Sequence, residues 1–324
     1  MTSSITGMAE SSWSHEALLP IRVATDDPRC PDSLIDVYRK GLRGQWDAQT
    51  DLDWSHVLSP ENPLQMHDGT NPLADTPIWR KLSPAQQTQV RCDLQRWHIS
   101  QILHGERASM LCAGKVMLSS TDSTIKACAA VQAVDEARHV EVYERLLAKI
   151  GPAFAVSPSL KTLLDNVLSD SDEGITALGM QILVEGLALA FFKSLQRYSS
   201  DPLTRSLLEL VMRDEARHFA VGQITLQQQH AHLSQAELAR REDFAADACG
   251  LLHDYLFADE VWAPLGLPAR ECAEHSRNSK VNRAMHRMLF RHLTPAIHHL
   301  GLLGPRMERR LDEMGVLHYA AFPI

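Results

Sequence analysis

The word Asp-Glu-Ala-Arg-His occurs twice in the chain, at residues 135–139 and 214–218. Each copy has a glutamate three residues before a histidine, which puts both side chains on one face of a helix. A carboxylate and an imidazole in this arrangement can bind the same metal ion. The repeat therefore predicts two Glu-His pairs, Glu136 with His139 and Glu215 with His218.

Two single glutamates complete the pattern. If both pairs belong to one centre in a four-helix bundle, each should be joined by a glutamate from a neighbouring helix. Glu106 precedes Glu136 by the same interval of sequence as that by which Glu185 precedes Glu215. This equal spacing indicates a duplicated helical hairpin.

The charge of such a site predicts its metal. Four glutamates in a bundle core would repel one another and would be costly to desolvate as anions, so they require protons or cations. Two divalent ions would balance them. Oxygen ligands with one imidazole per metal suit iron or manganese better than zinc or calcium. We expect two iron ions, with manganese as the second choice, and the following ligands: Glu106, Glu136, His139, Glu185, Glu215 and His218.

The repeated word also contains an aspartate and an arginine. Asp135 and Asp214 each lie four residues before a ligand histidine, where a carboxylate could accept the outer N–H of an imidazole. Arg138 and Arg217 are three residues from those aspartates and could pair with them. The alternative is a solvated Asp-Arg pair on the surface of each helix.

Four long helices must position these residues, and the sequence predicts them at about 84–119, 123–150, 172–198 and 202–231. Ser83-Pro84 and Asp201-Pro202 are typical helix starts. Glu106 is as far before Ser119 as Glu136 is after Ser123, so the two lie equally far from the turn between their helices. The second hairpin repeats this geometry.

The rest of the chain is predicted to surround the bundle. Residues 1–82 are expected to form an irregular arm, and 83–324 a helical domain with further helices from about 235 and within 270–314. Pro295 and the Gly-Leu-Leu-Gly-Pro segment are expected to interrupt the last helices. The predicted fold class is all-α, a four-helix bundle with additional N- and C-terminal helical segments.

Composition narrows the partners and the location. The chain is 44% hydrophobic with a net charge of −8 and no long basic block, which argues against nucleic acid or a membrane as partner. The apolar stretch 176–192 has Glu185 near its centre, so we expect a core helix. The six cysteines show no metal or disulfide spacing, and the N-terminus shows no signal peptide. We therefore expect reduced thiols and a cytoplasmic protein.

With these six residues the chain resembles the ferritin-like non-haem diiron-carboxylate oxidase and oxygenase superfamily. The resemblance covers about 84–231 and implies a diferrous centre that binds O2. The size and the outer helices look like the para-aminobenzoate N-oxygenase group. That group has a further histidine ligand four residues before the second Glu-x-x-His glutamate, where this chain has Val211. Hydroxylation, N-oxygenation and desaturation all remain open.

Three functions compete. They are an O2-dependent oxygenase or oxidase, iron storage as a ferroxidase or peroxide detoxification, and a radical-generating subunit like that of ribonucleotide reductase, with Tyr143 as the radical position. The long segments outside the bundle favour an enzyme with a small organic substrate, which could be carrier-bound. No flavin or nicotinamide motif is visible, so the electrons should come from a separate reductase or from the substrate. A homodimer stays open. Residues near the ligands suggest an apolar cavity, or ordinary packing: Met110, Ala113, Ala133, Ala188, Leu189, Phe192, Phe219 and Gly222.

Overall fold

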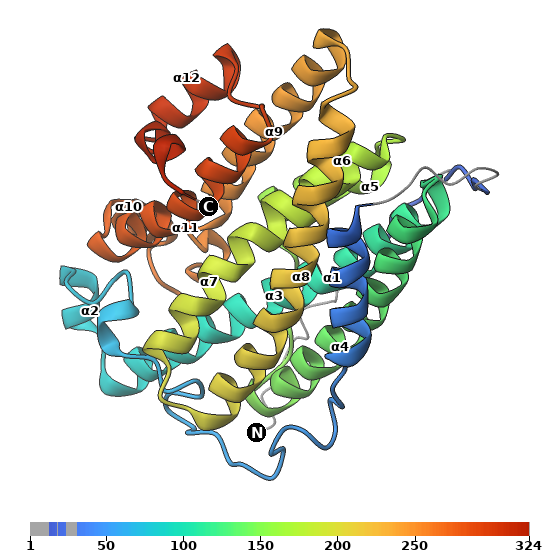
Figure 1. Cartoon of the computed structure of the whole chain (residues 1–324). Coiled ribbons are helices and arrows are strands. Elements are labelled where there is room, and N and C mark those ends of the chain that lie inside the picture. The colour runs from blue at the N-terminus through green and yellow to red at the C-terminus, as the bar shows by residue number, and fades with distance from the viewer. Residues whose placement is uncertain (1–12, 18, 24–30, 324) are drawn as a thin grey trace.

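The computed structural model describes residues 13–17, 19–23 and 31–323. The four predicted long helices are present and form a bundle (Figure 1). Three are α3 (Pro84–Ser119), α4 (Ser123–Ile150) and α8 (Pro202–His230). The fourth consists of α6 (Glu173–Ala177), a π-helical segment η2 (Leu178–Val184) and α7 (Glu185–Tyr198). The fold is an all-α four-helix bundle with additional helices, and the described residues contain no strand.

Side-chain caps fix the starts of the bundle helices. Ser83 and Gln86 form a reciprocal capping box at α3, with Pro84 in the first turn. The Asp122 carboxylate accepts two backbone N–H groups at the start of α4, and Asp201 accepts the Thr204 N–H at the start of α8. Each cap satisfies N–H groups that a helix leaves unpaired at its start. The predicted helix boundaries therefore agree with the structure to within one or two residues.

The N-terminal segment is mostly irregular and lies against the bundle. It contains α1 (Asp32–Arg43), the short η1 (Asp68–Thr70) and α2 (Pro77–Lys81). Helix α1 packs on α4 and α8, the two helices that carry the repeated word (Figure 1). The chain that follows α1 consequently passes directly over the repeats.

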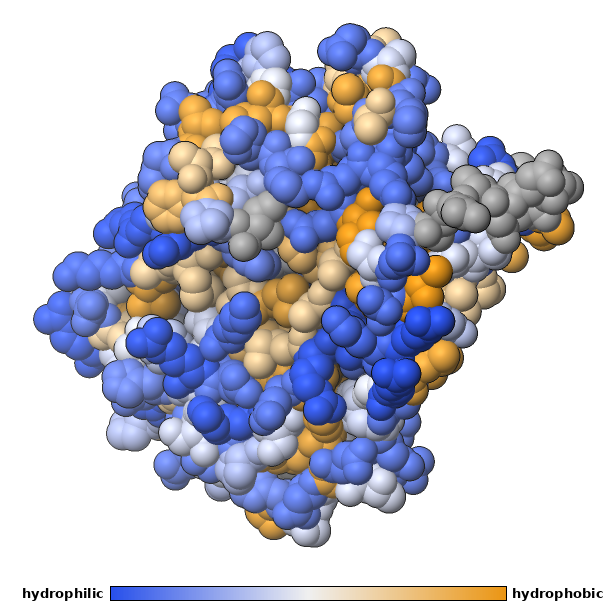
Figure 2. All heavy atoms as spheres, in the orientation of Figure 1, coloured by the Kyte–Doolittle hydropathy of each residue, from blue (hydrophilic) through white to orange (hydrophobic). Residues whose placement is uncertain are grey.

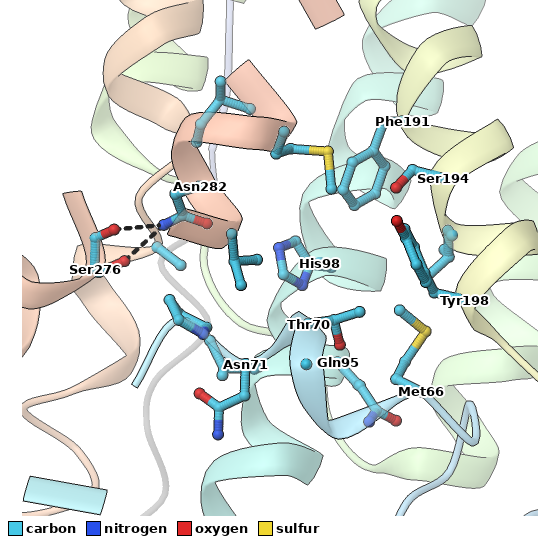
Figure 3. Close-up of a pocket in the computed structure, with 18 of the residues that line it drawn as sticks. Met66, Thr70, Asn71, Gln95, His98, Phe191, Ser194, Tyr198, Ser276 and Asn282 are labelled. Carbon is cyan, nitrogen blue, oxygen red and sulfur yellow. Dashed lines mark hydrogen bonds between the residues drawn. The ribbon is translucent and has the colours of Figure 1, made fainter. Parts of the chain in front are cut away.

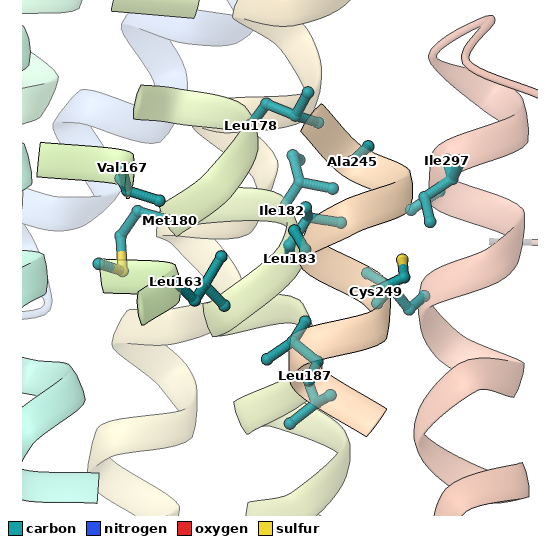
Figure 4. Packing of buried hydrophobic residues seen from close by; sticks show 14 of the residues in the cluster. Leu163, Val167, Leu178, Met180, Ile182, Leu183, Leu187, Ala245, Cys249 and Ile297 are labelled. Carbon is teal, nitrogen blue, oxygen red and sulfur yellow. The ribbon is translucent and has the colours of Figure 1, made fainter. Parts of the chain in front are cut away.

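The C-terminal helices cover the opposite side of the bundle, around η2 and α7. They are α9 (Gln235–Tyr255), α10 (Ala269–Asn278), α11 (Lys280–His299) and α12 (Pro305–Glu313), with the short η3 (Asp259–Val261) and η4 (Leu317–Ala321). Helix α5 (Pro158–Ser169), which connects the two hairpins of the bundle, packs with them. Figure 4 shows Leu163, Ile182 and Cys249 in the cluster that joins α5, η2 and α9. This cluster fixes the helix that carries Glu185.

The prediction that Pro295 interrupts a helix is wrong. Pro295 lies inside α11, which continues to His299. Leu293, Ala296 and Ile297 around it are fully buried. Their packing outweighs the backbone hydrogen bond that proline cannot donate. The Gly-Leu-Leu-Gly-Pro segment does separate α11 from α12, as predicted.

The helical stretch Glu173–Tyr198 is the one candidate among the described residues that is long and apolar enough to cross a membrane. Within the protein, 83% of its apolar window is buried. It therefore serves as a core helix, as the central glutamate predicted. The face in Figure 2 is largely hydrophilic, with apolar residues gathered near its centre, where α7 runs in Figure 1.

The π-helical segment η2 was not predicted, because hydrophobic spacing does not distinguish one wide turn from a regular helix. Two glycines let it pack closely. A Cβ at Gly179 would come within 2.4 Å of a Val167 methyl, and a Cβ at Gly222 on α8 within 2.7 Å of the Gln181 Cβ. The wide turn immediately precedes Glu185, and such turns are frequent at functional sites.

The tight contact at Gly222 predicts a stability difference. Gly222→Ala should destabilise the protein by about 1–3 kcal/mol, because the added methyl meets an atom next to the backbone. Gly114→Ala in α3 is the matched control: its Cβ would meet nothing within 4 Å, and it should stabilise by about 0.5–1 kcal/mol. Thermal unfolding measures both. Equal shifts in the two variants would contradict the packing described here.

Candidate metal centre

All six residues predicted as metal ligands meet at one level of the bundle interior. Their ligand atoms form two groups, and within each group all atoms lie within 4.8 Å of one another. All six side chains are buried. The first group holds Glu106, Glu136, His139 and Glu215, and the second holds Glu136, Glu185, Glu215 and His218.

Glu136 and Glu215 belong to both groups because each directs one oxygen to each histidine. The Oε2 of Glu136 lies 3.2 Å from Nδ1 of His139, and its Oε1 lies 3.1 Å from Nδ1 of His218. The corresponding distances from the two oxygens of Glu215 are 3.0 and 3.5 Å. Glu106 and Glu185 each join only one group. The arrangement suits two ions bridged by two carboxylates.

The aspartates of the repeated word hold the outer nitrogens of the histidines, but they do so in a crossed manner. Nε2 of His139 lies 3.2 Å from Asp214, and Nε2 of His218 lies 3.2 Å from Asp135. Each aspartate thus contacts the histidine of the other copy, across α4 and α8. With the outer nitrogen bonded to a carboxylate, Nδ1 of each ring is directed at the centre.

The arginines of the repeated word complete this layer. Arg138 pairs with Asp135, and Arg217 with Asp214, as the sequence predicted. Each also reaches the other aspartate, at 3.4 Å for Arg138 and 3.2 Å for Arg217. Although burial opposes ionisation of Asp214, contacts with His139 and Arg217 hold its pKa below the usual range. The alternative of solvated surface pairs is wrong for these side chains, which are mostly buried.

The N-terminal arm contributes two residues that sequence reasoning missed. The indole N–H of Trp46 donates to Asp214 at 2.7 Å, and the Gln45 amide donates to Asp135 at 2.9 Å. The Trp46 ring also stacks on His139, with centroids 6.4 Å apart. Both residues precede the bundle in an aperiodic segment, so no spacing related them to the repeats.

A second group of polar residues missed by the sequence surrounds Glu185. Ser109 and Gln132 lie 2.6 and 2.8 Å from its Oε1, and both also contact Glu136. Gln181, within η2, donates to Gln132 at 2.7 Å. These hydrogen bonds orient the carboxylate that lies just after the π-helical turn.

The charges of the buried glutamates and histidines indicate whether the site suits metal cations. Burial and the nearby Glu215 carboxylate raise the pKa of Glu106 and of Glu185 well above the usual range. Burial opposes protonation of His139 and His218, but the surrounding carboxylates outweigh it and raise both pKa values. Both oxygens of Glu215, Oε2 of Glu185 and Nδ1 of His218 form no hydrogen bond with the described residues. Buried ligand atoms that make no hydrogen bond, in a site that requires positive charge, fit two metal cations.

Tyr143 and Val211 are both fully buried close to this level of the bundle. The Tyr143 ring lies 6.3 Å from that of Phe192, and its hydroxyl has no hydrogen-bond partner among the described residues. Val211 packs in the apolar cluster around Tyr143 and supplies no ligand atom. The centre therefore contains two histidines, one for each group.

A small cavity of about 60 Å³ opens on the centre. Glu106, Glu185 and Glu215 form part of its wall, together with apolar residues such as Ile102 and Leu187. We call it the inner chamber. The expected cavity lining is only partly correct: of the eight residues expected, Ala188 and Phe192 line this chamber. Six of the expected residues do not line it: Met110, Ala113, Ala133, Leu189, Phe219 and Gly222. Of these, Leu189 and Phe219 pack in the main apolar cluster, and Gly222 contacts η2.

The remaining histidines and the described cysteines lie outside both groups. His104 contacts the Phe154 carbonyl, His298 contacts the Ala320 carbonyl, and His253 packs on His286. Cys112, Cys128, Cys249 and Cys272 are buried, and Cys92 is partly exposed. Cys30 lies outside the described residues.

Fold and site together define a non-haem diiron oxygenase or oxidase. The family model described as P-aminobenzoate N-oxygenase AurF matches residues 37–301, which is most of the chain. The chain belongs to this family. The match runs from the middle of α1 through the whole bundle to the end of α11.

The chain is also similar to solved structures, at low sequence identity. The R2-like ligand-binding oxidase from Sulfolobus acidocaldarius is 17% identical, with 80% of this chain and 90% of that chain covered and a TM-score of 0.46. A putative class I ribonucleotide reductase from Bacillus halodurans is 12% identical, with 87% and 99% covered and the same TM-score. No curated protein matches the chain. The family assignment therefore depends on the family match.

Removal of a shared carboxylate should disrupt both groups together. Glu136→Ala or Glu215→Ala should reduce the metal bound by protein made in iron-replete cells from two ions per chain to nearly none. Cys112→Ala is the control, because this buried thiol of α3 belongs to neither group. Elemental analysis measures the metal. A wild-type protein that holds no metal, or a single zinc ion, would contradict the site.

Proposed function

We propose that the chain uses O2 to oxidise a small organic substrate, by hydroxylation, N-oxygenation or desaturation. Two iron ions, with manganese as the alternative, would be held by Glu106, Glu136, His139, Glu185, Glu215 and His218, and they would reduce O2 to an oxidant. The observation that carries the proposal is the inner chamber, because its wall includes three of these carboxylates. A substrate group in this chamber would lie directly beside the metal ligands.

The surrounding side chains would keep the reaction productive. Asp135 and Asp214 hold the outer nitrogens of both histidines, so the rings cannot rotate away from the centre. Ile102, Leu187 and Phe192 give the chamber an apolar wall that excludes bulk water. Water exclusion would direct the oxidant to the substrate.

The electrons must come partly from outside. Oxidation of one substrate bond supplies only half of the electrons that full reduction of O2 requires. The remainder would come from a separate reductase or from further oxidation of the substrate. We propose a soluble electron donor as the partner of this chain, and the cytoplasm as its location.

Reaction with O2 distinguishes the enzyme from an iron store. The ferrous protein, mixed with O2, should react until two irons per chain are oxidised and then stop, because the C-terminal helices and the arm enclose the bundle. Stopped-flow absorption and O2 consumption follow the reaction, repeated with aryl amines, amino acids and acyl thioesters. One substrate class should accelerate the second phase and yield an oxygenated or desaturated product. Uptake of iron far beyond two per chain would contradict the proposal.

Radical generation is the second candidate, and the burial of Tyr143 near the centre is the observation that favours it. Burial and the Glu106 carboxylate raise the pKa of Tyr143 well above its usual range. If this residue were the radical site, exposure of the ferrous protein to O2 would give a persistent tyrosyl signal in electron paramagnetic resonance, absent in Tyr143→Phe. We expect no such stable signal, because Tyr143 packs in an apolar cluster and its hydroxyl has no hydrogen-bond partner among the described residues to take the proton that radical formation releases.

A further inference from the structure

A second, larger cavity of about 500 Å³ lies beside the inner chamber. We call it the outer chamber. Figure 3 shows its wall: Phe191, Ser194 and Tyr198 from α7 on one side, Asn282 on the other, and His98 between them. Residues of segment 64–72 in the N-terminal arm line a further side. A cavity of this size can hold a ligand much larger than one aromatic ring.

Two aromatic residues separate the chambers, because Phe191 and Tyr255 line both of them. Each ring is held by a neighbour on α3. His98 lies 5.4 Å from the Phe191 ring, and Trp97 stacks on Tyr255 at 5.6 Å. Burial lowers the pKa of His98 to about 4, so its imidazole is neutral at pH 7. Two uncharged rings therefore lie at the boundary between the chambers, and we call this boundary the neck.

Two helices run the whole length of this double cavity. On α3, Arg91, Gln95 and His98 line the outer chamber, and the same helix face continues inward to Ile102 and Glu106. At the rise of a helix, the path from Arg91 to Glu106 is about 20 Å. Helix α7 provides a parallel wall over a similar length, from Tyr198 at the outer end to Glu185 at the centre.

The two volumes set the shape of a ligand that fills both chambers. A cavity of about 150 Å³ is known to hold one benzene ring, whereas the inner chamber has about 60 Å³. Only a slender group, such as an unbranched chain or a small polar end, fits beyond the neck. The bulk of the molecule would remain in the outer chamber.

The outer end of the cavity carries positive charge. Asp68, Arg91 and Lys280 lie there, and Arg91 donates to Asp68 at 3.0 Å. Lys280 forms no ion pair with the described residues and is solvent-exposed. It is also the first residue of α11, where the helix dipole favours an anion. One positive charge at the rim is therefore uncompensated.

We infer that the two chambers together bind an elongated, mainly apolar substrate with an anionic end at Lys280 and a slender reacting group that passes Phe191 and Tyr255. This inference rests on the proposed oxidation at the inner chamber. In this inference the neck selects the group that reacts, and Lys280 at the rim recognises the far end of the substrate.

The neck is tested by the binding of straight-chain carboxylates from butyrate to myristate. Calorimetry measures their affinity for the full chain, loaded with manganese and kept without O2. Affinity for the wild-type protein should rise about threefold to fourfold with each added methylene, and p-aminobenzoate should bind more weakly than the longest chains. Phe191→Trp narrows the neck, and Ala188→Leu fills the inner chamber. Both should lower affinity for the longest chains at least tenfold and leave the shortest unchanged.

Phe244→Trp is the matched control, because Phe244 packs beside Gly179, away from both chambers. Affinity that does not grow with chain length would overturn the inference. So would losses in the Phe191 and Ala188 variants no larger than in the Phe244 control.

The rim is tested with Lys280→Met. This change should weaken carboxylates about twofold to fivefold, as expected for one exposed ion pair, and leave alcohols of equal length unchanged. Lys40→Met in α1 is the control. Equal binding of acid and alcohol by the wild-type protein would overturn the anionic end. These measurements use no O2, so intact binding with no oxidation by the iron-loaded protein would contradict the proposed function alone.

Discussion

Burial of negative charge is the constraint on which this structure depends. Helices α4 and α8 bring two glutamates and two aspartates into the same interior layer, and α3 and α7 add two more glutamates. Carboxylates so close together are tolerated only when each faces a cationic or hydrogen-bonding partner. Histidines meet them on one side and arginines on the other. The bundle is therefore assembled around charge compensation as much as around its apolar contacts.

The N-terminal arm takes part in this compensation. Trp46 and Gln45 supply N–H groups to the two aspartates, and Arg138 lies over the Trp46 ring at 5.3 Å. These contacts close the polar layer on the side that faces α1. Farther along, residues 64–72 form one wall of the outer chamber. One irregular segment therefore contacts the residues that orient the predicted ligands on one side, and it lines the proposed substrate path on another.

The sequence predicts the bundle and the six ligands because both depend on regular spacing: helical period, caps, and residues equally far from a turn. Glu106 and Glu185 could be found only through the repeats they accompany. The crossing of Asp135 and Asp214 could not be predicted, because spacing along one helix does not tell which neighbouring helix a side chain faces. Trp46, Ser109 and Gln132 reach the site through tertiary packing alone. For the same reason, only two of the eight residues expected from helix faces to line a cavity do line the inner chamber.

The crossed contacts have a consequence for how the centre assembles. His139 is oriented by an aspartate from α8, and His218 by one from α4, while Glu136 and Glu215 serve both sides. Neither half of the centre has an oriented histidine unless the other helix is already in place. Loss of the Asp214 carboxylate would therefore release His139, and loss of the Asp135 carboxylate would release His218, so that damage to one copy of the repeat reaches the histidine of the other copy.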